Sequence, residues 1–389
     1  MSFATPLPSH LRVKDSPSPS ENGASPRLRS NGEQMPTMRD VLSAIPESCF
    51  ERSLVRSLLY LTRSLILTIA PSVLAALFIP YTISAIPLWI GYAIVTGTVA
   101  TGLWVVAHEC GHRAFCKNSA LQDSVGFILH SLLLVPYFSW QRSHAIHHAK
   151  TNHLDDGETH VPARSDSASA PRKGMLGSLG DDAFAIMKIL RYCILGWPSY
   201  LLFGVSGGPS RGITNHFWPH WPFQNDMFVG RWRWKVLLST VGVGVVLAGL
   251  VTWGWMAGSA WPVLALYVGP YLVVNFWLVL YTWLHHTDVD IPHLDSDEWT
   301  WVEGAFLTVD RPYGWLLDEL HHRIGSTHVA HHVYARIPHY HAQRATDSIR
   351  EAFPDLYRFD PTPIPVALFR IARRCEAVVE SESGWIYEE

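Results

Sequence analysis

Two long segments of the chain contain no charged side chain. Residues 64–107 and 236–287 lack Asp, Glu, Lys and Arg, although 16% of the 389 residues are charged. A helix needs about 20 apolar residues to cross the hydrocarbon core of a bilayer, so each segment is long enough to cross twice. The pattern therefore favours an integral membrane protein over a soluble fold, in which about 25% of the residues are charged.

Each uncharged segment is interrupted near its middle. Pro80 and Pro87 flank a polar turn in the first segment, and Gly258, Ser259 and Pro262 interrupt the second. Because Pro and Gly disfavour the interior of a helix, each segment divides into a helical hairpin. We predict an all-α membrane protein with four transmembrane helices in two hairpins, at about residues 61–79, 88–107, 236–257 and 262–284.

Basic residues indicate how the hairpins are oriented in the membrane. Neither hairpin turn carries a charge, whereas basic residues precede both hairpins: Arg52, Arg56 and Arg63 before the first, and Arg231, Arg233 and Lys235 before the second. Segments rich in Lys and Arg beside membrane helices remain in the cytosol. We therefore expect both termini and residues 108–235 to be cytosolic.

The segments outside the hairpins differ in composition. Residues 1–36 are rich in Ser, Pro and Gly and are expected to form a disordered tail. We expect one membrane domain with a helical cytosolic cap at residues 37–370, and a C-terminal tail at residues 371–389. The apolar stretches 124–138 and 192–206 are too short to cross the bilayer and are expected to be interfacial or re-entrant.

Two counts exclude other classes of protein. The net charge of −3 provides no overall basic field of the kind that binding to nucleic-acid phosphates requires. The five cysteines are odd in number and irregularly spaced, which argues against a disulfide framework.

Histidines recur at metal-ligand spacings in three places. An H-x-x-x-H group follows the second predicted helix, and two later groups share the pattern H-x-x-H-H. Residues three and four apart lie on one face of a helix, so each group can present its imidazoles to a metal. The three groups supply eight candidate ligands: His108, His112, His144, His147, His148, His328, His331 and His332.

Two further histidine pairs need separate treatment. His285 and His286 end the fourth predicted helix on the same side of the membrane, so they offer a ninth candidate ligand. His216 and His220 also have the spacing H-x-x-x-H, but Pro219 lies between them and disfavours a shared helix face. We therefore do not assign that pair to a site.

Eight or nine imidazoles exceed the number that one metal binds. A zinc ion accepts three or four protein ligands, so the count predicts two metal ions. Neutral imidazole suits iron, copper and zinc. We choose iron, because oxidation of an unactivated C–H bond in an apolar substrate needs dioxygen chemistry, which a redox metal supplies and side chains lack.

Two alternatives remain at this point. His108, Glu109 and His112 also match the zinc metalloprotease pattern H-E-x-x-H, although that chemistry uses fewer histidines. A histidine-rich metal transporter is the second alternative. It is disfavoured because transporters place polar ligands near the bilayer midplane, where both hairpins lack ionisable residues.

The histidine groups resemble those of the membrane fatty acyl desaturases, whose three boxes are H-x-x-x-H, H-x-x-H-H and H/Q-x-x-H-H. The likeness covers about residues 37–370 and is greatest to the plant and fungal oleate (delta-12) type of the endoplasmic reticulum. It extends beyond the boxes over five motifs: Ala-Ile-Pro-Glu-Ser-Cys-Phe-Glu-Arg-Ser at 44–53, Ala-His-Glu-Cys-Gly-His at 107–112, Val-Pro-Tyr-Phe-Ser-Trp at 135–140, Thr-Val-Asp-Arg-Pro-Tyr-Gly at 308–314, and Thr-His-Val-Ala-His-His-Val-Tyr-Ala-Arg-Ile-Pro-His-Tyr-His-Ala at 327–342.

The resemblance implies a di-iron centre held by the eight histidines of the boxes and by His286 rather than His285. It further implies that dioxygen is the co-substrate and that a cis double bond forms in the acyl chain of a phospholipid or acyl-CoA, converting oleoyl to linoleoyl. The sequence lacks the haem motif of a fused cytochrome b5, so electrons are expected from a separate cytochrome b5 and its NADH-dependent reductase. The expected location is the endoplasmic reticulum membrane.

Several questions stay open within the family. Its members include omega-3 desaturases, acetylenases, hydroxylases and epoxygenases, which differ at a few positions around the acyl chain. Glu109 favours the delta-12 type, because omega-3 members often have Asp there. The remaining histidines near the boxes have no assigned role: His285, His321, His322, His339 and His341.

Overall fold

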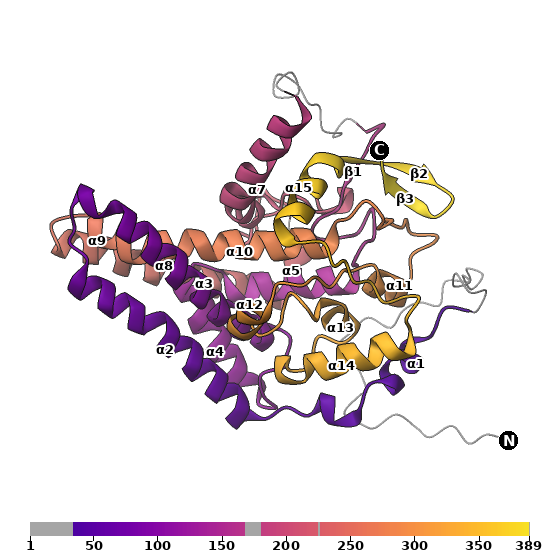
Figure 1. Ribbon diagram of the computed structural model, residues 1–389, viewed down its shortest axis with the longest axis horizontal. Coiled ribbons are helices and arrows are strands. Elements are labelled where there is room, and N and C mark those ends of the chain that lie inside the picture. The colour runs from indigo at the N-terminus through magenta and orange to yellow at the C-terminus, as the bar shows by residue number, and fades with distance from the viewer. Residues whose placement is uncertain (1–33, 168–179, 225, 389) are drawn as a thin grey trace.

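The computed structural model describes residues 34–167, 180–224 and 226–388. In this part of the chain the protein is mostly helical, with one three-stranded sheet (Figure 1). The disordered tail expected at residues 1–36 lies outside the described residues except for its last three positions.

Four helices in the described residues are long and apolar enough to cross a membrane. The first hairpin is formed by α2 (Leu54–Phe78) and α3 (Ile86–Gly111), which the short helix η3 (Ile83–Ala85) precedes. The second hairpin is formed by α8 (Arg231–Met256) and a helix made of three successive parts: α9 (Trp261–Val263), the π-helical η6 (Leu264–Val268) and α10 (Gly269–His286). All four helices extend past the predicted limits at the ends that carry the basic residues and histidines, because the helical backbone continues beyond the apolar stretch.

The inner pair of the four helices is α3 and α10. In the most apolar part of α3, 61% of the residues are buried, against 11% in α2. Gly97 lets α3 approach α10 closely, because a Cβ atom at this position would lie 2.4 Å from the Cβ atom of Val273. The outer helices instead expose apolar side chains such as Leu77 and Val251. This is the arrangement expected where lipid surrounds a packed helical core.

After α3, the chain between the two hairpins folds back toward the end of α3. Helix α4 (Ser119–Leu132) and helix α5 (Tyr137–Ala149) meet at a bend of 105°. The apolar stretch 124–138 therefore covers most of α4 and the start of α5, and the pair counts as a fifth span only if it is treated as one broken helix. The second apolar stretch, 192–206, falls mainly in α7 (Asp181–Phe203).

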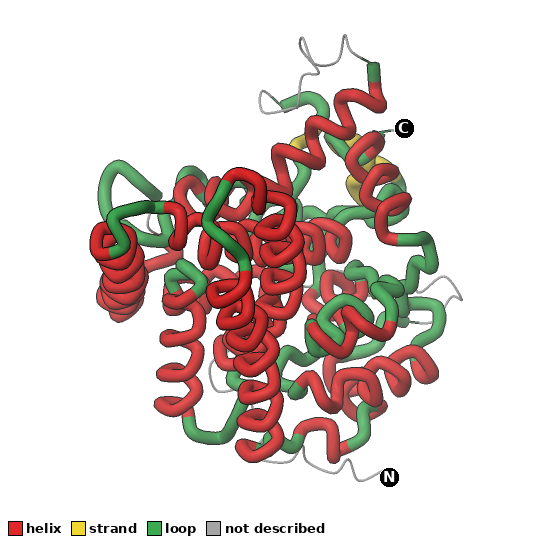
Figure 2. Tube along the Cα trace, turned by 60° about the vertical axis from the view of Figure 1, so that its left-hand side comes forward, coloured by secondary structure: helices red, strands yellow, loops and turns green. Residues whose placement is uncertain are grey.

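The rest of the described chain forms a cap of short helices. Both hairpin turns lie at the left of Figure 1, whereas the cap lies at the right, and Figure 2 shows the long helices side by side. The cap helices are α1 (Met38–Ala44), η2 (Glu47–Phe50), α11 (Trp301–Phe306), α12 (Trp315–Leu320), α13 (His328–Val333), α14 (His339–Ala352) and α15 (Ile364–Arg374); η4 (Pro209–Arg211) and η5 (Asp226–Phe228) precede α8.

The C-terminal residues are part of this cap. Residues 371–389, expected to be a tail, contain the end of α15 and a hairpin of β2 (Ala377–Ser381) and β3 (Gly384–Tyr387). Strand β1 (Ala163–Arg164) pairs in parallel with β2. Burial of Val378 and Tyr387 against α10 and α15 explains why this segment folds. All five cysteines are free and buried, in agreement with the expected absence of disulfides.

Candidate metal centre

One group of five imidazoles forms where α3, α5 and α13 meet. Their candidate ligand nitrogens all lie within 4.8 Å of one another. The Nε2 atom of His108 is 2.9 Å from Nε2 of His144 and 3.2 Å from Nε2 of His112. The first group consists of His108, His112, His144, His148 and His331.

A second group forms beside it, at the end of α10. The second group consists of His147, His286 and His332, whose candidate ligand nitrogens also lie within 4.8 Å of one another. The Nε2 atom of His286 is 3.1 Å from Nε2 of His147 and 3.0 Å from Nε2 of His328. The structure thus brings all nine sequence-predicted histidines to two adjacent sites, with His328 joined to the second group through His286.

Each H-x-x-H-H box contributes to both groups. On α5, His144 and His148 belong to the first group and His147 to the second. At 3.6 residues per turn, His148 points about 40° to one side of His144 and His147 about 60° to the other. A single helical turn can therefore supply ligands to two neighbouring metals.

The imidazoles have the protonation state that a metal requires. Burial lowers the pKa of His331 to about 3. Burial and the neighbouring His331 hold the pKa of His112 well below its usual range. Neutral imidazole is the form that binds metal. Among the described residues, the buried Nε2 atoms of His331 and His332 have no hydrogen-bond partner, so this donor set fits two metal ions.

Two threonines fix the orientation of ligands in the second group. The Thr151 hydroxyl donates to the carbonyl oxygen of His147 (2.8 Å), so its oxygen can accept from Nδ1–H of His332 at 3.0 Å. The hydroxyl of Thr159 lies 3.0 Å from Nδ1 of His147. A proton on Nδ1 leaves Nε2 free to bind metal. We did not predict either threonine; Thr151 could have been found because it lies four residues after His147, but Thr159 has no such spacing.

The histidines with no assigned role have other partners. His285 bonds to the carbonyl oxygen of Gly325 at 3.1 Å, and its ring stacks on His328 without joining either group. His321 bonds to the Tyr281 hydroxyl and to a backbone carbonyl, and His322 bonds to a serine hydroxyl. His216 bonds to the Ser143 hydroxyl and lies outside both groups.

Glu109 is hydrogen-bonded to α14 and belongs to neither imidazole group. Its carboxylate accepts hydrogen bonds from the backbone N–H and from the Nδ1 atom of His339, the latter at 2.7 Å. A metalloprotease would need this carboxylate as a general base beside a metal held by few histidines. The bond to His339 and the five imidazoles of the first group do not match that arrangement.

A cavity between α3 and α10 reaches both groups. Its lining includes imidazoles of the first group (His108 and His144) and of the second (His147 and His286), together with His285 and His328. The other lining residues are mainly apolar or aromatic: Thr101, Trp104, Val105, Leu278, Tyr281, Thr282 and Ile324. The lining therefore suits an apolar group and lies next to both metal sites.

Comparison with known proteins agrees with this arrangement. The fatty acid desaturase family profile matches residues 85–362. The chain is 42% identical over 350 residues to a delta(12)-fatty-acid desaturase of Arabidopsis thaliana, covering 89% of this chain and 88% of the relative. An endoplasmic reticulum omega-6 fatty acid desaturase of Brassica juncea is 40% identical over 96% of both chains. An oleoyl-12-hydroxylase of Ricinus communis is 40% identical over 90% of this chain and 88% of its own length. The protein therefore belongs to the fatty acid desaturase family, a group of oxidoreductases that act on acyl lipids.

Proposed function

We propose that this protein is a dioxygen-dependent acyl-lipid desaturase that converts oleoyl chains to linoleoyl chains by introducing a cis double bond at the delta-12 position. The observation that carries the proposal is the apolar cavity bordered by imidazoles of both groups. The names of the Arabidopsis and Brassica relatives support the position of the double bond.

The nine predicted histidines are the proposed ligands of two iron ions. Five imidazoles of the first group would hold one ion, and His147, His286, His328 and His332 would hold the other. When bound, the irons supply the redox chemistry with which dioxygen removes two hydrogens from the acyl chain.

The protein's own side chains position the substrate and exclude water. Trp104 on α3 and Leu278 on α10 line the cavity, as does Ile324. An acyl chain lying along these walls would keep two adjacent methylene groups beside the imidazoles. The reacting position is then set by how far the chain can enter, which is a question of geometry.

The proposed location is the endoplasmic reticulum membrane, with both termini and the metal centre on the cytosolic side. The Brassica relative is named for that membrane. Electrons would come from cytochrome b5 and its NADH-dependent reductase, and the acyl chain from a phospholipid or acyl-CoA. Single cysteines at Ser84 and Ser259, in the two hairpin turns, should be labelled from the lumen, and one at Ser167 from the cytosol. Labelling of position 167 from the same side as position 84 would contradict the four-span arrangement.

A second candidate function is hydroxylation of the same acyl chain. The 40% identity to the oleoyl-12-hydroxylase is nearly equal to the identity to the desaturases, and the same cavity would present the same carbon. The two activities differ in product, so product analysis separates them.

The test is expression in a yeast that makes oleate but no linoleate. Gas chromatography with mass spectrometry of fatty acid methyl esters should detect linoleate, and purified protein should contain about two irons per chain. His147→Ala and His331→Ala should abolish the product, because each removes a ligand from a different group. His220→Ala is the control and should keep it, because His220 lies outside both groups. A hydroxylated product would support the second candidate, and stoichiometric zinc in active protein would contradict the di-iron proposal.

A further inference from the structure

The segment Thr308–Arg311 contacts two helices that carry histidines of the second group, α10 and α13. It is part of the Thr-Val-Asp-Arg-Pro-Tyr-Gly motif, and none of its residues belongs to either imidazole group. Its side chains are completely buried except for a small exposed part of Val309. Its contacts therefore require an explanation other than ligation.

Arg311 binds the end of α10, where His286 is located. The last four carbonyl groups of a helix have no partner within the helix. Arg311 Nε donates to the carbonyl oxygen of Leu284 at 2.9 Å, and the backbone N–H of Val309 donates to that of His285 at 3.0 Å. A positive charge at this end also stabilises the helix through its dipole. The last turn of α10 is thereby held in one position.

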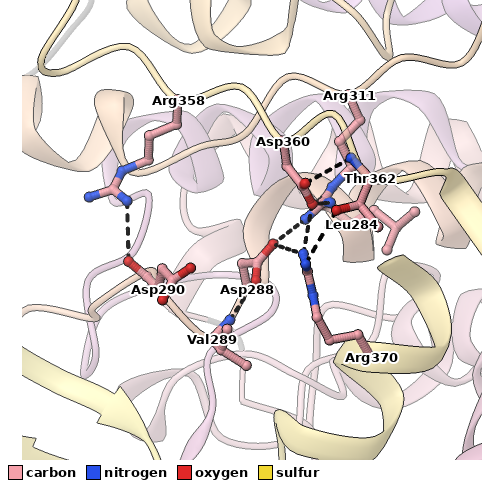
Figure 3. Close-up of polar contacts among 9 residues, drawn as sticks. All are labelled: Leu284, Asp288, Val289, Asp290, Arg311, Arg358, Asp360, Thr362 and Arg370. Carbon is pink, nitrogen blue, oxygen red and sulfur yellow. Dashed lines mark hydrogen bonds and ion pairs between the residues drawn. The ribbon is translucent and has the colours of Figure 1, made fainter. Parts of the chain in front are cut away.

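The guanidinium of Arg311 is itself fixed by a partly buried ion network, shown in Figure 3. It donates to Asp288 at 2.6 Å and forms a second ion pair with Asp360. Arg370 bonds to the same two carboxylates at 2.8 and 2.7 Å. The charges of the two carboxylates and the two guanidiniums thus balance. The planar guanidinium of Arg311 reaches three acceptors, on Leu284, Asp288 and Asp360, which the single ammonium group of a lysine could not span.

The neighbouring residue binds the other helix. The carboxylate of Asp310 accepts a hydrogen bond from the backbone N–H of Val329 in the first turn of α13, at 2.9 Å, and another from the Tyr357 hydroxyl at 2.8 Å. Adjacent residues therefore link the helix end that carries His286 to the helix that carries His328. The Nε2 atoms of these two histidines lie 3.0 Å apart.

We propose that Arg311 is a positioning residue for the second metal site. Helix α10 contributes His286 to the second group and no ligand to the first, so a shift of its last turn should affect one site selectively. The inference rests on the proposed di-iron function, because it requires two separately occupied sites. Loss of the supporting contact should weaken metal binding at that site by about 10- to 100-fold.

The test compares iron content in purified full-length variants. Arg311→Lys keeps the charge but loses the three-way contact, so it should retain about one iron per chain. The wild type should retain two irons. The control is Arg358→Gln, since the Arg358 side chain lies in the same region but donates to the carbonyl oxygen of Asp290 rather than to the Arg311 network (Figure 3); this variant should also retain two irons.

A milder variant covers the case in which Arg311→Lys does not fold. Asp360→Asn weakens the anchor of Arg311 and leaves the contact to Leu284 in place. In Asp360→Asn, the iron at the second site should be lost to a chelator about tenfold faster than in the wild type. The rate at which the other iron is lost should be unchanged. Two irons in Arg311→Lys, or equal loss of both irons in Asp360→Asn, would overturn the inference alone. Fewer than two irons in active wild-type protein would overturn both this inference and the di-iron proposal.

Discussion

Removing the hydroxyl of Thr151 should weaken the second metal site without removing a ligand. Thr151 is 2% exposed, and its oxygen accepts from Nδ1–H of His332 at 3.0 Å because its own proton is donated to the carbonyl oxygen of His147. Thr151→Val keeps the shape of the side chain but leaves Nδ1–H buried without an acceptor. Ring rotation and the tautomer with the proton on Nε2 both become more accessible, and each opposes metal binding.

The size of this effect follows from the lost contact. An unsatisfied buried polar group costs about 1–3 kcal/mol, and about 1.4 kcal/mol corresponds to tenfold in a binding constant. Iron at the second site should therefore bind about 5- to 150-fold more weakly. This range agrees with the effect of removing the hydrogen-bond partner of a ligating histidine in other metal sites, about 10- to 100-fold.

The assay is chelator competition on purified protein, followed by activity with and without added iron. Thr151→Val should lose one iron at lower chelator concentration and recover activity when iron is in excess. Thr151→Ser, which keeps the hydroxyl, should behave like the wild type, and Thr68→Val on α2 controls for loss of a threonine hydroxyl that bonds only to its own helix. Equal chelator sensitivity in Thr151→Val and Thr151→Ser would refute the assigned role.

Three further outcomes follow from the structure. His286→Ala should abolish activity and lower the iron content, whereas His285→Ala, which loses a bond to a backbone carbonyl, should keep bound iron. Loss of iron in His285→Ala but not in His286→Ala would place the ligand one residue earlier. Burial raises the pKa of Glu158 to about 8, so the folded protein holds a proton on this carboxyl that the unfolded chain releases near pH 4. The stability that Glu158 contributes is therefore lost as pH rises from about 5 to 8, and in thermal unfolding the wild type should lose stability relative to Glu158→Gln over that range. Gly97→Ala should destabilise the protein by about 1–3 kcal/mol by separating α3 from α10. The control is Gly91→Ala on the same helix, whose added methyl group meets no neighbouring atom and should be tolerated. Equal melting temperatures for the two variants would contradict the close packing at Gly97.

Much of the membrane fold is evident in the sequence, because lipid requires long uncharged helices. The four helices occur at the predicted places, and Gly258 lies in the turn between α8 and α9. Their ends were predicted less accurately, since hydropathy falls where the helix leaves the bilayer while the backbone hydrogen bonding continues. The C-terminal hairpin was not predicted, because its folding depends on contacts with distant residues such as Arg164 and His293.

The candidate site was predictable in its membership but not in its internal arrangement. Spacing alone brings His144, His147 and His148 to one side of a helix with His147 and His148 pointing about 100° apart, but nothing in the sequence shows that His147 joins a different group from the other two. The separation arises because α10 approaches α5 from the side of His147, where His286 lies 3.1 Å away. The contacts of Arg311 were likewise hidden, because its partners Leu284 and Asp360 are separated from it by 27 and 49 residues.

The division of each H-x-x-H-H box between the two groups has a consequence for how the apoprotein acquires its ions. Helices α5 and α13 carry ligands for both sites, so an ion at one site restrains the same two helices that position ligands of the other. The conformational entropy lost in holding those helices would then be lost largely once, which favours binding of the second ion. We therefore expect the second ferrous ion to bind the wild-type apoprotein more tightly than the first, and a variant whose second site is weakened by more than this coupling to hold a single ion.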